Sequence, residues 1–196
     1  SVDVPTLALL FGLMVVSAQL RLGGFYQGAT RGLAGARLSP PALLAVLVLG
    51  AGVLSAVFSN DIVCLAAAPV LVDVCRRKRL DPVPFLLALA CAANVGSAAT
   101  LIGNPQNMLI GQVLHLPFAA FLVDAGVAAT IGLALTWAVI ARQSRGHWRL
   151  EGPATAVDLS SGETAGPQVL DRWQVGKGLV AAAALLAAFL LLPWPR

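Results

Sequence analysis

Long runs of apolar residues fill most of the chain, and short polar or basic clusters separate them. The runs cover residues 4–20, 41–58, 62–74, 85–93, 108–114, 117–141 and 176–192. A helix rises about 1.5 Å per residue, and the hydrocarbon core of a bilayer is about 30 Å thick. The runs 4–20, 117–141 and 176–192 are therefore predicted to cross a membrane as single helices.

Two of the apolar runs flank the polar cluster Ser59-Asn60-Asp61. As a helix, the run 62–74 extends only about 20 Å, which is too short for a crossing, and Pro69 is expected to kink it. Two helical arms that meet at a polar tip, with basic residues at both outer ends, are typical of a re-entrant hairpin. We predict such a hairpin over residues 41–75.

A second polar interruption, NVGSAATLIGNPQN over residues 94–107, divides the apolar segment 82–114. In lipid, an unpaired backbone polar group costs several kcal/mol, so broken helices persist only where protein or trapped water satisfies them. Two breaks of this kind indicate the substrate and ion site of a transporter. We therefore predict a discontinuous helix over residues 82–114.

The composition adds one conclusion, namely that the protein is embedded in a membrane. It is 58% hydrophobic and 11% charged, whereas a soluble domain carries about 25% charged residues. The net charge is +4, but no aromatic residues interleave with the basic ones, so nucleic-acid binding is not indicated. We expect an all-α integral membrane protein.

The basic residues predict the orientation, because cytoplasmic loops carry an excess of Lys and Arg. The Gly- and Arg-rich segment 21–38 is read as an interfacial helix or loop on the cytoplasmic side. A hairpin then returns residues 76–81 to that side, and the next crossings return the polar loop 142–172. This predicted topology places every basic residue except Arg196 on the cytoplasmic side. We predict cytoplasmic loops over 21–40, 76–81 and 142–172 in the plasma (inner) membrane.

The two interruptions carry groups suited to an anion and to a hard cation. Ser59 or Asn60 is expected to cap the second hairpin arm, and Asn104 before Pro105 predicts that another helix begins there. Helix N-termini near the middle of a membrane bind anions through unpaired N–H groups, while carbonyl and side-chain oxygens suit sodium. The predicted substrate- and ion-binding residues are Ser59, Asn60, Asp61, Asn94, Ser97, Thr100, Gly103, Asn104, Pro105 and Asn107.

Two carboxylates fall within the apolar segments, where a charge costs about 2.5–3.5 kcal/mol at the bilayer centre. Three roles are open for Asp61: it could ligate the cation, it could carry a proton, or it could only cap the hairpin arm. Asp124 lies about 10 Å inside the outer end of its span, and it snorkels, caps, or pairs with a polar group of the broken helix. Both carboxylates are candidates for a proton or ion relay.

The remaining reactive side chains do not indicate an enzyme or a metalloprotein. Cys64, Cys75 and Cys91 stand alone, without a CxxC motif or a Cys/His cluster, so neither a disulfide framework nor a zinc site is expected. His115 and His147 are single loop histidines. No HExxH, GxSxG or Walker A motif occurs. We expect no enzymatic activity and no cofactor apart from a coupling sodium ion or proton.

The sequences around both interruptions resemble a known superfamily. FSNDIVCLAAAP, followed by NVGSAATLIGNPQNMLIG, is similar to the ion transporter superfamily, above all to its citrate-transporter-like and arsenical-pump-like permeases. A more distant similarity is to the divalent anion/sodium symporters. The opening stretch TLALLFGLMVVSAQLRLGGFY resembles the segment before their hairpin, and the whole resemblance covers roughly residues 4–141.

This resemblance implies two inverted repeats, each with a re-entrant hairpin and a discontinuous helix, that move against a scaffold in a homodimer. It places residues 1–141 in the first repeat and residues 173–196 at the first span of the second.

The resemblance also implies roles for single positions. Ser59 and Asn60 correspond to the hairpin tip and residues 103–105 to the unwound part of the broken helix, so that Ser59, Asn60 and Gly103 would ligate a transported sodium ion. The tip of the sodium-coupled symporters reads Ser-Asn-Thr. Here Asp61 replaces the threonine, which favours proton coupling or cation–proton exchange.

The sequence thus predicts part of a secondary active transporter that moves a small inorganic or carboxylate anion with sodium or protons. A sodium/proton antiporter, with Asp61 binding the cation, is the alternative within transport. A membrane scaffold subunit without transport is the alternative from another class. The lipid bilayer and a second copy of the full-length protein are the expected partners.

Overall fold

The computed structural model describes residues 38–149 and 172–191, together with a few single positions before residue 24. Across these residues the protein is helical, and its one β-contact is an isolated bridge between Leu80 and Arg149. The predicted all-α fold is confirmed for this part of the chain. The predicted span 4–20, almost all of the segment 21–38 and most of the loop 142–172 lie outside the described residues.

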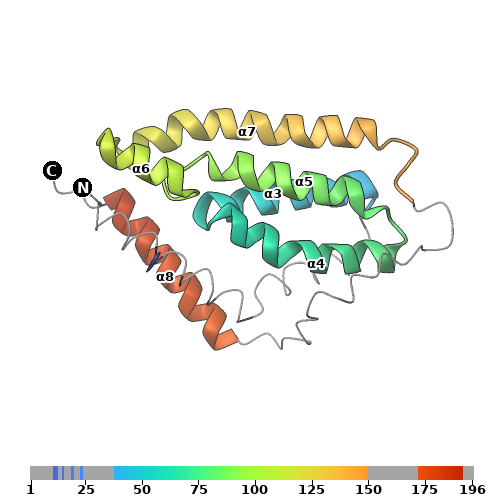
Figure 1. Ribbon diagram of the computed structural model, residues 1–196, viewed down its shortest axis with the longest axis horizontal. Coiled ribbons are helices and arrows are strands. Elements are labelled where there is room, and N and C mark those ends of the chain that lie inside the picture. Colours follow the sequence, from blue (N-terminus) through green and yellow to red (C-terminus); the bar gives the residue numbers. More distant parts are fainter. Residues whose placement is uncertain are drawn as a thin grey trace.

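Six helices make up the described structure. They are α3 (Pro40–Val57), α4 (Asn60–Lys78), α5 (Pro82–Ser97), α6 (Pro105–Val113), α7 (Phe118–Gln143) and α8 (Arg172–Leu191). α3, α4, α5 and α7 lie lengthwise in one bundle, while α6 lies at one end of it and α8 runs obliquely (Figure 1). By length and composition, α3 and α7 are apolar enough to cross a membrane.

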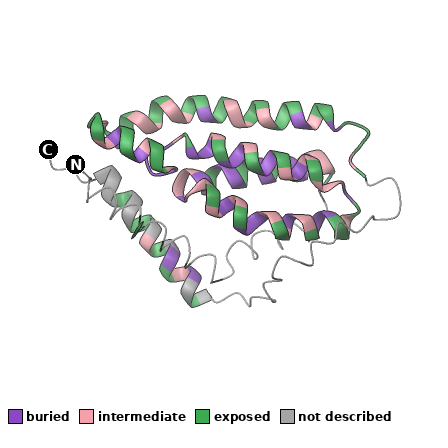
Figure 2. Cartoon of the chain, in the orientation of Figure 1, coloured by how far each residue is buried: buried purple, intermediate pink, exposed green. Residues whose placement is uncertain are grey.

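α5 occupies the centre of the bundle, because α3, α4 and α7 all pack against it. The core is apolar and includes Leu43, Leu44, Leu47, Val48, Leu71, Phe85, Ala88, Leu89 and Ala92. Figure 2 shows these helices with buried positions on their facing sides, whereas α7 is exposed over most of its length. The apolar side chains that α7 exposes suit contact with lipid rather than with water.

The chain reverses direction between α3 and α4. Near the end of α5, Gly96 meets Gly52 near the end of α3, so these two helices run in the same direction. At the start of α4, Asn60 bonds to Asn94 of α5, so α4 runs in the opposite direction. The second arm therefore returns to the end of the bundle where α3 begins.

Glycines allow the helices to approach closely at the level of this reversal. A Cβ on Gly96 would overlap the carbonyl oxygen of Gly52. A Cβ on Gly52 would lie 2.7 Å from Cδ1 of Leu133, and one on Gly132 would lie 2.8 Å from Cγ1 of Val95. Small residues of this kind let helix backbones pack tightly in membranes.

The predicted length of the second arm is wrong. α4 runs from Asn60 to Lys78, about 28 Å, instead of ending near residue 74. Arg and Lys are good helix formers and interact favourably with the negative end of the helix dipole, so the basic cluster continues the helix. Arg79, in the left-handed conformation with φ of 53°, ends it.

The break in the discontinuous helix is also shorter than the polar stretch 94–107. α5 continues through Ser97 and α6 begins at Pro105. The helix accommodates two polar residues because their side chains bond to its own carbonyls: Asn94 Nδ2 donates to Ala90 at 2.9 Å, and Ser97 Oγ donates to Asn94 at 2.9 Å. The unwound part is therefore residues 98–104.

Candidate functional site

The two interruptions lie next to each other and are bonded together. The first junction joins α3 to α4 at Ser59, and the second joins α5 to α6 over residues 98–104. Asn60 Nδ2 donates to Asn94 Oδ1 at 3.0 Å, and the Thr100 hydroxyl donates to the carbonyl of Ala56. We call this unit, with the last turn of α5 between the two breaks, the paired junctions.

The first junction leaves the start of α4 without a side-chain cap. Ser59 occupies the N-cap position, but no side chain caps the helix there, so the predicted capping by Ser59 or Asn60 is wrong. Its carbonyl instead accepts from the N–H groups of Ile62 and Val63 at 3.1 and 3.2 Å. The amide of Asn60 is directed to Asn94. The N–H groups of Asn60 and Asp61, which precede those of Ile62 and Val63, therefore have no side-chain cap, and the start of α4 keeps its positive partial charge.

The second junction has the predicted cap. Asn104 is the N-cap of α6, its Oδ1 accepts from the N–H of Asn107 at 2.8 Å, and Pro105 is the first helical residue. The Asn104 amide also donates to Ser97 Oγ at 3.3 Å. The amide of Asn107 donates to the carbonyl of Thr100 at 3.0 Å. These bonds fold the start of α6 against the end of α5.

Burial separates the site residues into two groups. Ser97 and Thr100 are 1% and 4% exposed, and Gly103 is also buried, where a Cβ would overlap the carbonyl oxygen of Ser97. Asn104 and Asn107 are half-buried. The second junction is thus a packed unit. The Ser97 carbonyl accepts from the side-chain amides of Asn104 and Asn107, each at 3.5 Å, and the Thr100 carbonyl accepts from Asn107 at 3.0 Å.

The carboxylates lie at the edge of this unit or away from it. Asp61 is exposed in the first turn of α4, and Asp124 is exposed on α7. Among the described residues, no hydrogen bond joins either carboxylate to the paired junctions. No group of three His, Cys, Asp or Glu side chains could hold a metal ion in this part of the chain. A cation at the paired junctions would therefore meet mainly neutral oxygens.

The paired junctions lie near the middle of the longest apolar helix. α7 has 26 residues, and Gly132, close to its midpoint, faces Val95 in the last turns of α5. Leu133 faces Gly52, about one and a half turns before the end of α3. In a bilayer that α7 crosses, both breaks are accordingly near mid-depth.

Two residues near the site were not predicted from the sequence, because residues 41–58 look like a uniformly apolar helical arm. Gly52 provides the close contact with Gly96. Ser55 is fully buried, and its hydroxyl has no hydrogen-bond partner. A glycine and a serine three residues apart within an apolar run were the available signal.

A helical bundle with an apolar outer face and two polar helix breaks near mid-depth defines a membrane protein of the transporter class. The comparisons with known proteins agree with that class. The chain belongs to the citrate transporter family, which matches it over residues 1–196. The family and its transporter relatives also agree with the expectation that the chain is not an enzyme.

Three curated relatives show the range of the family. The silicon efflux transporter LSI3 of Oryza sativa subsp. japonica is 33% identical over 81% of this chain and 32% of its own length. A 46 kDa membrane protein of Mycobacterium leprae is 30% identical over 98% and 44%. The putative transporter arsB of Dictyostelium discoideum is 31% identical over 66% and 23%. The chain therefore spans less than half the length of these relatives, and no solved structure matches it.

Proposed function

We propose that the full-length protein is a secondary active transporter of a small anion, coupled to sodium or protons, and that the paired junctions form this chain's part of the binding site. One observation carries the proposal: the Asn60–Asn94 and Thr100–Ala56 hydrogen bonds unite two helix breaks that lie far apart in the sequence. A helix break inside a membrane is costly unless it lines a site.

The anion is favoured by the two helix starts at the paired junctions. α4 begins without a side-chain cap and α6 begins at Asn104, and both starts adjoin the last turn of α5. The dipoles of both helices, and the uncapped first N–H groups of α4, attract negative charge without a cationic side chain. The family is described as citrate transporters, which supports a carboxylate or a similar inorganic oxyanion as cargo.

The coupling ion is assigned to the first junction. Asn60 uses its amide nitrogen on Asn94, which leaves its side-chain oxygen available to a cation. Asp61, one residue further, is exposed and supplies either a negative ligand or a proton carrier. The presence of Asp61 at this position favours protons over sodium as the coupling ion.

The proposed placement in the membrane follows from the depth of the hairpin tip and from the position of the basic side chains. The tip at Ser59 stops near mid-depth of α7, which supports a re-entrant hairpin. In this placement, the Lys and Arg side chains at the ends of α4 and α7 face the cytoplasm of a cell whose plasma (inner) membrane holds the protein. A homodimer of the full-length protein completes the proposed assembly.

Reconstitution of the full-length protein in liposomes tests this function. Uptake of labelled citrate, sulfate and arsenite is measured under an imposed sodium or proton gradient, with Asn60→Ala compared with Thr130→Ala, which alters a hydroxyl on the exposed face of α7. We expect gradient-driven uptake of one anion that Asn60→Ala abolishes. Sodium-driven proton efflux without an anion requirement would establish the antiporter instead. No uptake of any anion by the reconstituted protein, together with Asp61→Asn and Asn104→Ala variants that disturb assembly, would leave the scaffold role.

A further inference from the structure

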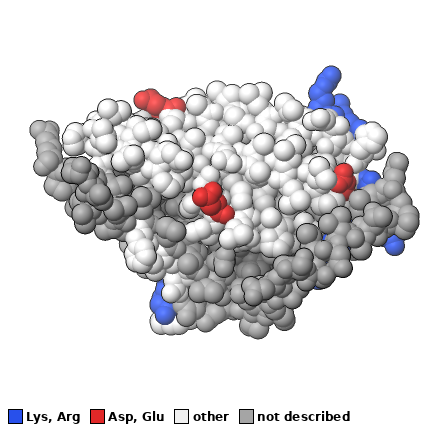
Figure 3. All heavy atoms as spheres, viewed as in Figure 1, with Lys and Arg blue, Asp and Glu red and all other residues white. Residues whose placement is uncertain are grey.

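Basic side chains gather at one end of the bundle, opposite the paired junctions. They come from the end of α4 and from the end of α7 with the turn that follows it, and they are Arg76, Arg77, Lys78, Arg79, Arg142, Arg145 and Arg149. On the face seen in Figure 3, basic groups lie at this end and the surface over α5 and α7 carries few charges. We call these seven side chains the basic end.

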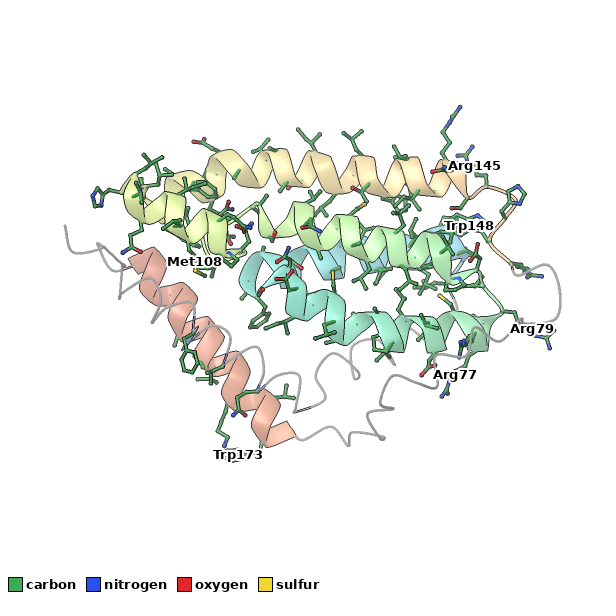
Figure 4. The ribbon with its side chains drawn as sticks, in the orientation of Figure 1. Arg77, Arg79, Met108, Arg145, Trp148 and Trp173 are labelled. Atoms are coloured by element: carbon green, nitrogen blue, oxygen red, sulfur yellow. The ribbon has the colours of Figure 1, made fainter. Side chains whose placement is uncertain are left out.

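A backbone clasp joins the two halves of the basic end. Leu80 and Arg149 form an antiparallel bridge, and the N–H of Asp81 donates to the carbonyl of Trp148 at 3.0 Å. The Trp148 ring packs against Phe85 with 5.9 Å between ring centroids. Figure 4 shows Arg77 and Arg79 on one side of this clasp and Arg145 on the other, with Trp148 between the helices. Residues from α4 and α7 therefore present one charged surface.

Few acidic groups lie beside this surface among the residues that the structure describes. Within residues 70–81 and 140–149, the acidic side chains are Asp73 and Asp81. Asp81 is occupied locally, because its Oδ1 accepts from the N–H of Val83 at 3.0 Å and caps α5. Arg77, Arg79, Arg142 and Arg145 are all exposed. Counted over these described residues, the basic end thus has more positive than negative side chains, and these four guanidinium groups are exposed.

The charged surface continues directly from an apolar one. Along α7, Val127, Ile131, Leu135 and Val139 are 57–60% exposed and recur every four residues, so they form one stripe on the helix. Arg142 follows one turn after Val139 and is exposed as well. An apolar stripe that ends in guanidinium groups has the polarity pattern of a phospholipid: acyl chains along the stripe and a phosphate at its end.

We propose that the basic end binds the phosphate headgroups of anionic phospholipids whose acyl chains lie along the exposed stripe of α7. Guanidinium groups bind phosphate through two parallel hydrogen bonds, and basic clusters beside membrane helices attract anionic lipid. The inference rests on the membrane placement of α7 and not on the anion carried at the paired junctions. The orientation of the helices in the membrane accounts for positive charge at the basic end. It does not account for the direct connection between this charge and the apolar stripe of α7.

A lipid titration of the full-length protein tests the proposal. Protein in neutral detergent is titrated with acyl-labelled dansyl phosphatidylglycerol, and energy transfer from tryptophan reports binding; dansyl phosphatidylcholine is the neutral comparison. Removal of Arg142 and Arg145 by Arg142→Gln/Arg145→Gln is expected to weaken phosphatidylglycerol binding about five-fold for each charge. The charge-retaining Arg142→Lys/Arg145→Lys is expected to keep most of it. Lys177→Gln, which removes a charge on α8, is the control. Its loss alters the surroundings of Trp173 and so the energy-transfer signal, but it is expected to leave the phosphatidylglycerol affinity unchanged.

Each outcome of the titration either supports the lipid site or overturns it. Phosphatidylglycerol binding that falls with salt and with the two arginines, but not with Lys177, supports the lipid site. If the α7 variant does not fold, Arg77→Gln/Arg79→Gln gives the same measurement from the α4 side. Equal affinity for phosphatidylcholine, or unchanged affinity in both variants, overturns the proposal. Full competition by soluble glycerol phosphate would show a free-anion site rather than a lipid site, and would overturn it too.

Discussion

The hydrogen bond between Thr100 and Ala56 offers the sharpest test of the paired junctions, and the change Thr100→Val removes only its hydroxyl. Thr100 is 4% exposed, and valine has nearly the same shape, so no cavity accompanies the loss. Ala56 lies in the last turn of α3, where carbonyls have no intrahelical N–H partner. The substitution therefore leaves a part-buried acceptor without its donor.

The expected cost follows from that geometry. An unsatisfied buried acceptor costs about 1–3 kcal/mol, whereas interhelical hydrogen bonds in membrane proteins average about 0.6 kcal/mol and reach about 1.7 kcal/mol. Since the bond is part-buried, we expect a loss near the lower of these limits, about 1 kcal/mol, in the free energy of unfolding. Denaturant unfolding of the full-length protein in detergent measures it.

Thr136→Val is the matched control for this measurement. The Thr136 hydroxyl donates to the Gly132 carbonyl at 2.8 Å within α7, and that carbonyl also accepts the helical N–H four residues later. Its loss is expected to cost less than about 0.5 kcal/mol. Equal losses for the two variants, or no loss for Thr100→Val, would refute the view that this bond holds the two breaks together.

Three further outcomes are expected. Gly96→Ala places a methyl group against the Gly52 backbone and should lower stability by about 1–3 kcal/mol, whereas Gly126→Ala, with 3.9 Å to the nearest side-chain atom, should be neutral or stabilising in a thermal melt. Asp61→Thr should make uptake sodium-dependent, and Asp61→Asn should abolish its proton dependence; unchanged ion dependence in both would exclude Asp61 from coupling. Asn60→Ala removes an exposed bond between two side-chain amides, so it should abolish uptake while lowering the melting temperature no more than Thr100→Val does; a full loss of folding would assign Asn60 a structural role.

Local sequence patterns predicted the parts of the fold that depend on neighbouring residues. The continuous apolar run 117–141 corresponds to α7 within two residues at its C-terminal end. The Asn104-Pro105 pair predicted the start of α6, because a side-chain cap and a proline at the first helical position act within a single turn. These signals need no knowledge of the rest of the chain.

Features that depend on tertiary contacts were not accessible in the same way. The α4 helix extends through its basic cluster. From the sequence alone this cluster fits a loop equally well, and the end of the helix is settled only by the backbone bridge that begins at Leu80. The Asn60 side chain is directed to Asn94 instead of its own helix start, and the competition between these bonds is decided only by packing. Gly52 and Ser55 look like ordinary members of an apolar run.

The hydrogen bonds at the paired junctions separate the groups that maintain the breaks from those left for a ligand. At the second junction, Asn104 and Asn107 satisfy the end of α5, so the unwound segment is stable without cargo. At the first junction, the start of α4 has no side-chain cap, and the Ser55 hydroxyl one turn earlier has no partner. Polar groups without a hydrogen-bond partner are costly near the middle of a membrane. A ligand that bonds to such groups at the first junction would remove this cost, whereas the polar groups of the second junction already have partners within the protein. Substrate and coupling ion should consequently stabilise the α3–α4 reversal more than the α5–α6 break. Hydrogen exchange of the full-length protein with and without its anion would show whether the protection gained on binding follows that order.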